Sequence, residues 1–315
     1  MNYRRLGRSG LKVSEVSLGS WLTIGKTVSE EDAKNIIHKA YDEGINFFDT
    51  ANVYANGEAE RVMAKSLKAF PRESYVITTK AFWPVGDGPN DRGLSRKHIY
   101  DQVHASLKRM ELDYIDIFYC HRYDKETPLD ETLRAIDDLI RQGKIRYVGV
   151  SEWTAAQMLE ALSVADQYLL NRIIVNQPQY NLLHREIEEE IIPISEKHGI
   201  SQVVWSPLAQ GVLTGKYLGG DIPSGSRAAN ENVNSWVKKI INDIVNRKLS
   251  LLNEIASELN ITLAQLALAW ILRQPNVAST LVGASHVEQI AENAEASTVV
   301  IPYQFLEEIE KIVTI

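Results

Sequence analysis

The sequence predicts an α/β fold, a (β/α)8 TIM barrel with an N-terminal β-hairpin cap and a long insertion between strands 7 and 8. Two observations indicate this fold class. Short apolar runs of strand length alternate with segments of helical period along the 315 residues, which is typical of repeated βα units. Eight such units fit within this length, as a TIM barrel requires. We therefore expect residues 1–315 to form one barrel domain.

A small hairpin is expected ahead of the barrel. Tyr3–Leu6 and Leu11–Val13 are short strand candidates, and Gly7–Gly10 lies between them as a turn. We expect this hairpin to cap the far end of the barrel, away from the carboxyl ends of its strands.

The barrel itself follows from eight strand candidates, each followed by a helical pattern. In chain order they are Val16–Leu18, Ile45–Asp49, Tyr75–Lys80, Tyr114–His121, Ile145–Val150, Ile173–Asn176, Ser201–Trp205 and Ser279–Val282.

Two helices show their pattern clearly. Ser29–Tyr41 has its apolar residues on one face, Ser29 and Asp32 resemble a capping box, and Gly44 supplies the stop. Leu129–Lys144 repeats the plan.

The segment Gly211–Asn276 is longer than one βα connection needs. It contains a Gly/Pro/Ser-rich loop, Leu218–Ser226, and then helices that include Ile240 and Trp270. A long insertion at this place favours a ligand lid over a separate domain.

An open, doubly wound sheet would share this alternation of strands and helices. Its G-x-G-x-x-G fingerprint is absent after the first strand, where Leu18-Gly19-Ser20-Trp21 stands instead. The barrel is therefore favoured.

Composition and charge exclude several classes of function. The formal net charge is −7 and no long Lys/Arg run occurs, so nucleic acid is not expected as a partner. No apolar run approaches the ~20 residues of a membrane span, so we expect no membrane association and a cytoplasmic location. The single cysteine, Cys120, lies in an apolar strand and is expected to be buried and inert. No metal site is expected, because no ligand cluster with suitable spacing occurs.

Polar residues at strand ends carry the chemistry. Asp49, Lys80 and His121 close three predicted strands, and Tyr54 lies five residues beyond Asp49. The carboxyl ends of parallel strands meet at one rim of a barrel, where barrel enzymes place their active sites. A carboxylate, a phenol, an ammonium and an imidazole at this rim predict a proton-transfer site.

The residue types suggest separate roles. Tyr54 would be a general acid, and the ammonium of Lys80 is expected to lower its pKa from about 10. Asp49 would keep Lys80 charged, and His121 would orient a substrate carbonyl. Two alternatives stay open at this point: a structural Asp49–Lys80 ion pair, and an isomerase or aldolase in which Lys80 forms a Schiff base.

Histidines elsewhere show no such setting. Four of them fall on helical patterns and are expected to face solvent: His38, His98, His104 and His198.

Six motifs occur in an order typical of one family: Phe48-Asp49-Thr50-Ala51-Asn52-Val53-Tyr54, Thr78-Thr79-Lys80, Tyr119-Cys120-His121-Arg122, Val148-Gly149-Val150-Ser151, Trp205-Ser206-Pro207-Leu208 and Val282-Gly283-Ala284-Ser285. Along essentially its whole length the chain resembles the aldo-keto reductases, and it is most similar to the potassium-channel β-subunit group and its bacterial reductase relatives. The resemblance implies NADPH-dependent reduction of aldehydes or ketones to alcohols by hydride transfer from the nicotinamide, with Tyr54 as general acid.

The resemblance also implies an NADP(H) site. Trp205 would stack on the nicotinamide, while Ser285 and Arg227 would hold the 2′-phosphate, so NADP is expected over NAD. Glu152 is left out, because a carboxylate cannot donate to the carboxamide oxygen. The implied cofactor residues are Gly19, Ser20, Trp21, Asp49, Ser151, Gln177, Trp205, Ser206, Pro207, Leu208, Gln210, Lys216, Arg227, Gly283, Ser285, Gln289, Glu292 and Asn293.

A small carbonyl substrate is expected near the same rim. Arg122 would meet a phosphate or carboxylate of the substrate, or else pair with Asp124. The residues expected to bind the substrate are Trp21, Tyr54, Trp83, His121 and Arg122.

The resemblance leaves a second function open, an NADP(H)-binding redox sensor or channel-accessory subunit with little turnover. Mammalian channel β subunits usually carry asparagine at the position of His121, so the histidine favours an enzyme. Ring-like assemblies occur among the similar proteins, which makes a homo-oligomer a further expectation.

Overall fold

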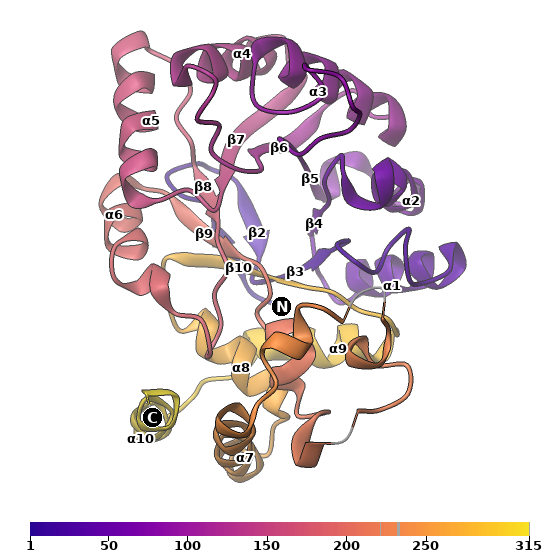
Figure 1. Cartoon of the computed structure of the whole chain (residues 1–315), viewed down its shortest axis with the longest axis vertical. Coiled ribbons are helices and arrows are strands. Elements are labelled where there is room, and N and C mark those ends of the chain that lie inside the picture. Colours follow the sequence, from indigo (N-terminus) through magenta and orange to yellow (C-terminus); the bar gives the residue numbers. More distant parts are fainter. Residues whose placement is uncertain (221, 232–233, 315) are drawn as a thin grey trace.

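The structure is a closed barrel of parallel strands surrounded by helices (Figure 1). It is a computed structural model that describes residues 1–220, 222–231 and 234–314. Asp221, in the predicted Gly/Pro/Ser-rich loop, lies outside the described residues. The architecture confirms the predicted (β/α)8 class and its N-terminal hairpin.

The strands begin within two residues of their predicted starts. The hairpin consists of β1 (Tyr3–Arg5) and β2 (Lys12–Ser14). The barrel strands are β3 (Val16–Gly19), β4 (Phe47–Asp49), β5 (Val76–Ala81), β6 (Ile115–Cys120), β7 (Ile145–Ser151), β8 (Val175–Gln177), β9 (Ser201–Val204) and β10 (Val277–Val282). Each pairs with the next along the chain, and β10 pairs with both β9 and β3, which closes the barrel.

Helices form the outer layer (Figure 1). The predicted helix starts hold: Ser29 caps the first helix by accepting a bond from the Asp32 backbone N–H, and Pro128 precedes the fourth. The α-helices are α1 (Glu30–Asp42), α2 (Glu58–Leu67), α3 (Arg96–Met110), α4 (Leu129–Arg141), α5 (Ala155–Tyr168), α6 (Ile191–His198), α7 (Asp243–Glu258), α8 (Leu263–Leu272), α9 (Glu288–Glu295) and α10 (Tyr303–Thr314).

The hairpin closes the amino-terminal end of the barrel. Arg4 donates to the backbone oxygens of Leu272 and Val277, beside the start of β10. Leu6 and Val13 pack with the apolar residues inside the barrel. The predicted cap at the far end is thereby confirmed, and the carboxyl ends of the strands stay open for a site.

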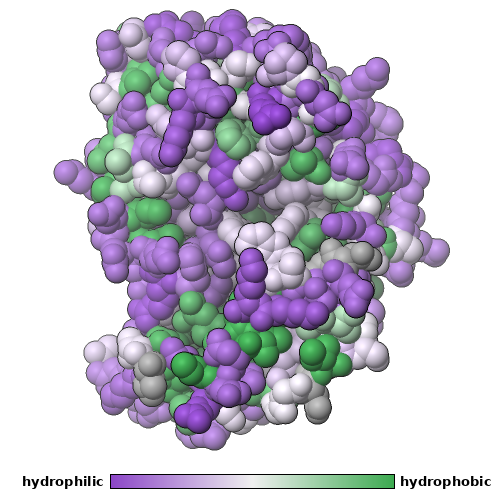
Figure 2. All heavy atoms as spheres, viewed as in Figure 1, coloured by the Kyte–Doolittle hydropathy of each residue, from purple (hydrophilic) through white to green (hydrophobic). Residues whose placement is uncertain are grey.

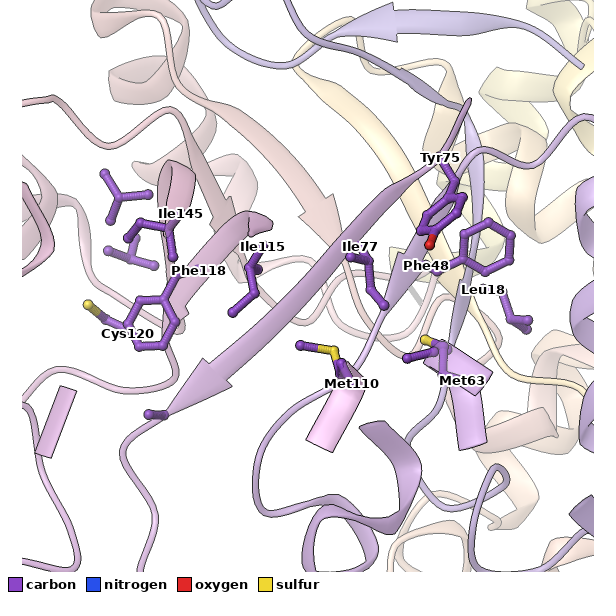
Figure 3. Packing of buried hydrophobic residues seen from close by; sticks show 14 of the residues in the cluster. Leu18, Phe48, Met63, Tyr75, Ile77, Met110, Ile115, Phe118, Cys120 and Ile145 are labelled. Atoms are coloured by element: carbon purple, nitrogen blue, oxygen red, sulfur yellow. The ribbon is translucent and has the colours of Figure 1, made fainter. Parts of the chain in front are cut away.

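Strand alternation divides the core into two layers, because successive side chains of a strand point to opposite faces. Ile117 and Tyr119 of β6 lie in the inner cluster, whereas Phe118 and Cys120 lie in the outer one. Figure 3 shows the outer layer, in which Met63 of α2 and Met110 of α3 pack in one cluster with strand residues.

The inner layer is tight at Gly149 of β7. A Cβ atom there would lie 2.5 Å from the Tyr119 ring and 2.6 Å from a Val175 methyl group, so only glycine fits at this inward position. The barrel interior is therefore closely packed around Gly149, below the rim.

The insertion between β9 and β10 contains α7, α8 and several short 3-10 turns. Hydrophobic residues gather in the lower part of the molecule, where the insertion lies (Figure 2). Ile222, Trp236 and Ile244 are more than half exposed there. Among the described helices, none alone is long and apolar enough to cross a membrane; α7 and α8 together pass on length and composition, but they meet at 89°.

Three smaller expectations can be compared with the structure. Ile240 is not helical but lies in the short connection before α7. His98 is buried, not solvated, because the residues between β5 and α3 fold over it and Asn90 offers its backbone oxygen to Nδ1 at 3.0 Å. Cys120 is buried as expected, and burial raises the pKa of its thiol to about 12.

Candidate active site

Strand alternation places the polar strand-end residues inside the rim. In β4 and β5 the inward positions include Phe47, Val76 and Thr78, so Asp49 and Lys80, two residues further along, also point inward. The same two-residue alternation in β6 places Ile117 and Tyr119 inward, so His121, directly after the strand, also points inward. The period of two, together with the parallel register, brings these side chains together.

Asp49 is the centre of a buried polar network. One of its carboxylate oxygens lies 2.5 Å from Lys80 Nζ, and the other accepts from Thr78 Oγ1 at 2.6 Å and Gln177 Nε2 at 3.0 Å. Lys80 Nζ also donates to the backbone oxygen of Thr50 at 2.8 Å. Burial lowers the pKa of Lys80, and the adjacent Asp49 opposes that shift.

Tyr54 lies above this network, at the start of a 3-10 turn, Tyr54–Gly57. Ala55 and Asn56 in that turn have left-handed backbone angles, with φ of 48° and 55°. The Tyr54 ring meets the His121 ring edge-on at 5.7 Å between centroids, and Lys80 Nζ lies 5.1 Å from the centre of the phenol ring. The turn therefore holds the phenol over the floor of the site.

The pKa of Tyr54 is raised, not lowered as the sequence suggested. Burial is the main cause, and the charge of Asp49 adds to it, while Arg122 opposes it. Lys80 is held by Asp49 and Thr50, so its positive charge is already balanced. The phenol consequently keeps its proton at neutral pH, which is the form that a proton donor needs.

His121 is held as a neutral imidazole. Burial lowers its pKa well below the ordinary range, and the cations Lys80 and Arg122 lower it further. Its Nδ1 atom finds no hydrogen-bond partner among the described residues. The ring lies between Tyr54 and Trp83, whose ring centre is 6.3 Å away.

These groups open onto a cavity of about 1230 Å³ at the carboxyl ends of the strands. Every residue expected for catalysis, cofactor or substrate lines it except Lys80, which lies beneath the floor with no exposed surface. The structure thus brings together side chains from widely separated segments, including the insertion and the loop after β10.

One end of the cavity is cationic. Arg227 donates to the side-chain oxygen of Gln210, and Lys216 lies close enough that Arg227 lowers its pKa, an effect second to burial. Nearby wall residues also present polar groups: the hydroxyls of Ser20, Thr23 and Ser226 are buried without a hydrogen-bond partner in the part of the chain that the structure describes. Cations and spare hydroxyls fit an elongated anionic cofactor such as NADP(H).

The middle of the cavity is shaped by the segment after β9. Ser206, Ala209 and Gln210 all have positive φ, and Asn181 Nδ2 donates to the Ser206 backbone oxygen at 3.0 Å. Such left-handed residues cost conformational energy and persist where the surrounding structure fixes them. Here they bend the chain around the cavity floor.

Trp205 is anchored by Glu152, a residue that sequence reasoning left out of the cofactor set. The indole N–H donates to a Glu152 carboxylate oxygen at 2.6 Å, and the same oxygen accepts from the Gln179 backbone N–H at 2.7 Å. Trp205 meets Trp21 edge-on at 6.1 Å, and Trp21 meets Trp236 at 6.5 Å. Glu152 therefore fixes the first ring of a three-tryptophan wall.

The parts of the lining that were missed from the sequence include Trp236 and the segment after Trp21. Trp236 gave a signal, as a tryptophan in a polar stretch of the insertion. The segment that contains Thr23 and Thr27 gave none, because its turns carry no chemical motif. Within the described residues, no group of three or more His, Cys, Asp and Glu side chains is arranged to hold a metal ion.

Comparison with known proteins agrees with this geometry. Residues 15–314 match the model of the aldo/keto reductase family. The chain is 49% identical over 303 residues to a probable voltage-gated potassium channel subunit beta of Arabidopsis thaliana, covering 95% of this chain and 92% of that protein. A protein of Oryza sativa subsp. japonica with the same description is 47% identical, covering 99% and 95%. A putative channel subunit beta of Schizosaccharomyces pombe is 44% identical, covering 93% and 87%.

Proposed function

Because this chain belongs to the aldo/keto reductase family, whose members carry out NAD(P)-dependent oxidoreduction, we propose that it reduces aldehydes or ketones to alcohols with NADPH. The observation that carries the proposal is the buried Asp49–Lys80 pair directly beneath Tyr54 and His121. Asp49, Tyr54 and His121 line one cavity whose other end is cationic, and Lys80 lies beneath its floor.

The cofactor would lie along the floor of this cavity. Trp205, fixed by Glu152, offers a ring face for the nicotinamide, and Ser151 and Gln177 lie beside it. Lys216 would meet the pyrophosphate and Arg227 the 2′-phosphate, a group that only NADP carries, which supports NADP over NAD. When bound, the nicotinamide supplies the hydride, because no side chain can donate one.

Side chains of this protein would supply the proton that the reduced carbonyl oxygen takes up. Tyr54 keeps its hydroxyl proton at neutral pH and would donate it to the oxygen of the substrate carbonyl. The neutral His121 would hydrogen-bond the same oxygen and orient it. Asp49 lies in the cavity floor and is paired with Lys80 beneath it, and Thr78 and Gln177 hold the Asp49 carboxylate in place. The donor therefore needs no rearrangement of the polar groups below it.

A small, partly apolar carbonyl compound fits the mouth of the cavity. Trp21 and Trp83 face the catalytic end, and Trp236 extends the same wall from the insertion. Aromatic walls with a few fixed polar groups are typical of small-molecule sites. The Schiff-base alternative is disfavoured, because Lys80 lies beneath the cavity floor and its ammonium is held by Asp49 and Thr50.

Titration with the cofactor followed by turnover tests the proposal. Protein fluorescence is titrated with NADPH and with NADH, and absorbance at the nicotinamide band is then followed with a panel of small aldehydes. We expect tighter NADPH binding and aldehyde-dependent oxidation. Failure to bind either cofactor would contradict the proposal outright.

A second candidate function is an NADP(H)-binding redox sensor or channel-accessory subunit. The observation in its favour is that relatives 44–49% identical are described as potassium channel beta subunits. Tight NADPH binding with negligible turnover on every aldehyde would favour this function over the reductase.

A further inference from the structure

We propose that Arg122 is a specificity residue for carbonyl substrates that carry an anionic group, a carboxylate foremost, and that its guanidinium binds this group while the carbonyl lies at Tyr54 and His121. This inference rests on the proposed reductase function and deepens it by naming the substrate class. The residue lines the cavity beside His121 and Trp83.

The contacts of Arg122 leave most of its donors unused. Nη1 donates to the backbone oxygen of His121 at 2.5 Å and weakly to Ser151 Oγ at 3.4 Å. No hydrogen bond from Nε or Nη2 to another described residue is found. The guanidinium carbon lies 5.4 Å from the centre of the Trp83 ring, so an aromatic surface holds the planar group in place.

Carboxylates near Arg122 are engaged elsewhere. Asp124, the partner that the sequence offered, accepts from the backbone N–H groups of Leu94 and Glu126 and from Thr127 Oγ1. Glu152 attracts Arg122 only at longer range, and one of its oxygens is taken by Trp205 and Gln179. Across the described residues, Arg122 makes no ion pair with a carboxylate.

A half-buried guanidinium without an ionic partner is costly, and an arriving anion would remove that cost. Arg122 is partly buried, so its charge is poorly solvated, and this burial lowers the pKa of its guanidinium. The remaining edge of the guanidinium, Nε and Nη2, matches the two oxygens of a carboxylate. Arg122 Nη1 donates to the backbone oxygen of His121, and the charge of Arg122 lowers the pKa values of Tyr54 and Lys80. The bound anion would therefore lie near the reacting carbonyl.

The charge of Glu152 should act on the preference for anionic substrates in the direction opposite to that of Arg122. Glu152 carries a negative charge in the neighbourhood of Arg122 and would repel an anionic substrate. Removing that charge should strengthen the preference for anions, whereas removing the charge of Arg122 should abolish it. A purely structural role for Arg122 predicts neither change.

Binding of an unreactive anion tests the inference without turnover. Benzoate and its neutral isostere benzamide are titrated by calorimetry into the protein saturated with NADP⁺, for wild type, Arg122→Met, Arg122→Lys and the control variant Arg92→Met. We expect benzoate to bind wild type about tenfold or more tightly than benzamide. Arg122→Met should bring the ratio close to one, Arg122→Lys should keep part of it, and Arg92→Met should keep all of it.

Turnover gives the second readout, with 4-carboxybenzaldehyde and 4-carbamoylbenzaldehyde as a matched charged and neutral pair. The kcat/KM ratio of charged to neutral substrate should fall about tenfold in Arg122→Met and rise a few-fold in Glu152→Gln. Arg92→Met, at an exposed arginine in the loop before α3, is the matched control and should leave the ratio unchanged.

The outcomes separate this inference from the proposed function. Equal reduction of both aldehydes, with benzoate binding no tighter than benzamide, would overturn the anion site and leave the reductase intact. Arg122-dependent benzoate binding without any aldehyde turnover would uphold the anion site and count against the reductase. A benzoate preference that survives unchanged in Arg122→Met would overturn the assignment.

Discussion

Asp49 and Lys80 form an ion pair with Oδ2 and Nζ 2.5 Å apart, and their side chains are only 4% and 0% exposed. Two charges removed from water in this way depend on each other, because each without its partner is an uncompensated buried charge. The pair therefore couples the stability of the barrel to the geometry beneath Tyr54.

Replacing Lys80 with Met should cost about 3–5 kcal/mol of unfolding free energy, since Asp49 would stay buried without its cation. The Asp49→Asn/Lys80→Met double variant should lose less than the two single variants added together. Urea unfolding of the four proteins measures this coupling. Simple additivity of the single losses would refute the dependence of one charge on the other.

Tyr54→Phe should lower kcat by ~10²–10⁴-fold, because it removes the proton donor. NADPH affinity and stability should change little, since no hydrogen bond joins the Tyr54 hydroxyl to another described residue. Steady-state kinetics and fluorescence titration provide the measurements. Tyr303→Phe, at a 75% exposed tyrosine of α10, is the control. Survival of most of the turnover in Tyr54→Phe would remove the phenol from the mechanism.

Arg227→Ala should weaken NADPH binding by about 10–100-fold and NADH binding much less, because one charged hydrogen-bond partner of the 2′-phosphate is lost. Fluorescence titration with both cofactors measures the difference. Lys238→Ala removes an exposed cation from the same insertion and should affect neither affinity. Equal weakening of both cofactors would show that Arg227 does not distinguish them.

The stability of the protein should fall as the pH is lowered, in part through His121. Burial lowers the pKa of His121 well below the ordinary range, whereas in the unfolded chain it returns to about 6.5. Below that pH the unfolded state binds a proton that the folded state does not, so acid favours unfolding.

Urea unfolding at about pH 7.5 and about pH 5.5 should therefore show a larger loss in wild type than in His121→Asn, by ~1.4 kcal/mol. His98, whose pKa burial also lowers, contributes in the same direction to both proteins and cancels in the comparison. An identical loss in the two proteins would mean that His121 takes up a proton in the folded state.

The arrangement of the barrel and its polar rim could be predicted because both follow from short-range periodicity. Alternation within a strand decides which side chains point inward, so a strand that ends on Asp49 or on His121 presents that residue to the rim. Parallel pairing then brings together residues that are far apart in the chain. The closed strand order confirms the predicted βα units.

Other features depend on tertiary packing and could not be derived this way. The pKa of Tyr54 is raised because the turn Tyr54–Gly57 buries the phenol. The sequence pattern around a loop residue does not predict whether that residue is buried. Trp236 reaches Trp21 only because the insertion folds back across the rim. Glu152 was left out of the predicted cofactor site because its carboxylate cannot donate a hydrogen bond. Its role as the acceptor for the Trp205 indole N–H could be seen only in the structure.

The pairing of β10 with β3 has a consequence for how the protein is made. Ser17 and Thr280, joined by a hydrogen bond across this seam, lie 263 positions apart in the chain. A ribosome releasing the protein from its amino end therefore leaves one edge of β3 unpaired until β10, more than 250 residues further on, has emerged. Such a long-range pairing slows folding and exposes the nascent chain to mispairing. The barrel can close only when β10 pairs with β3.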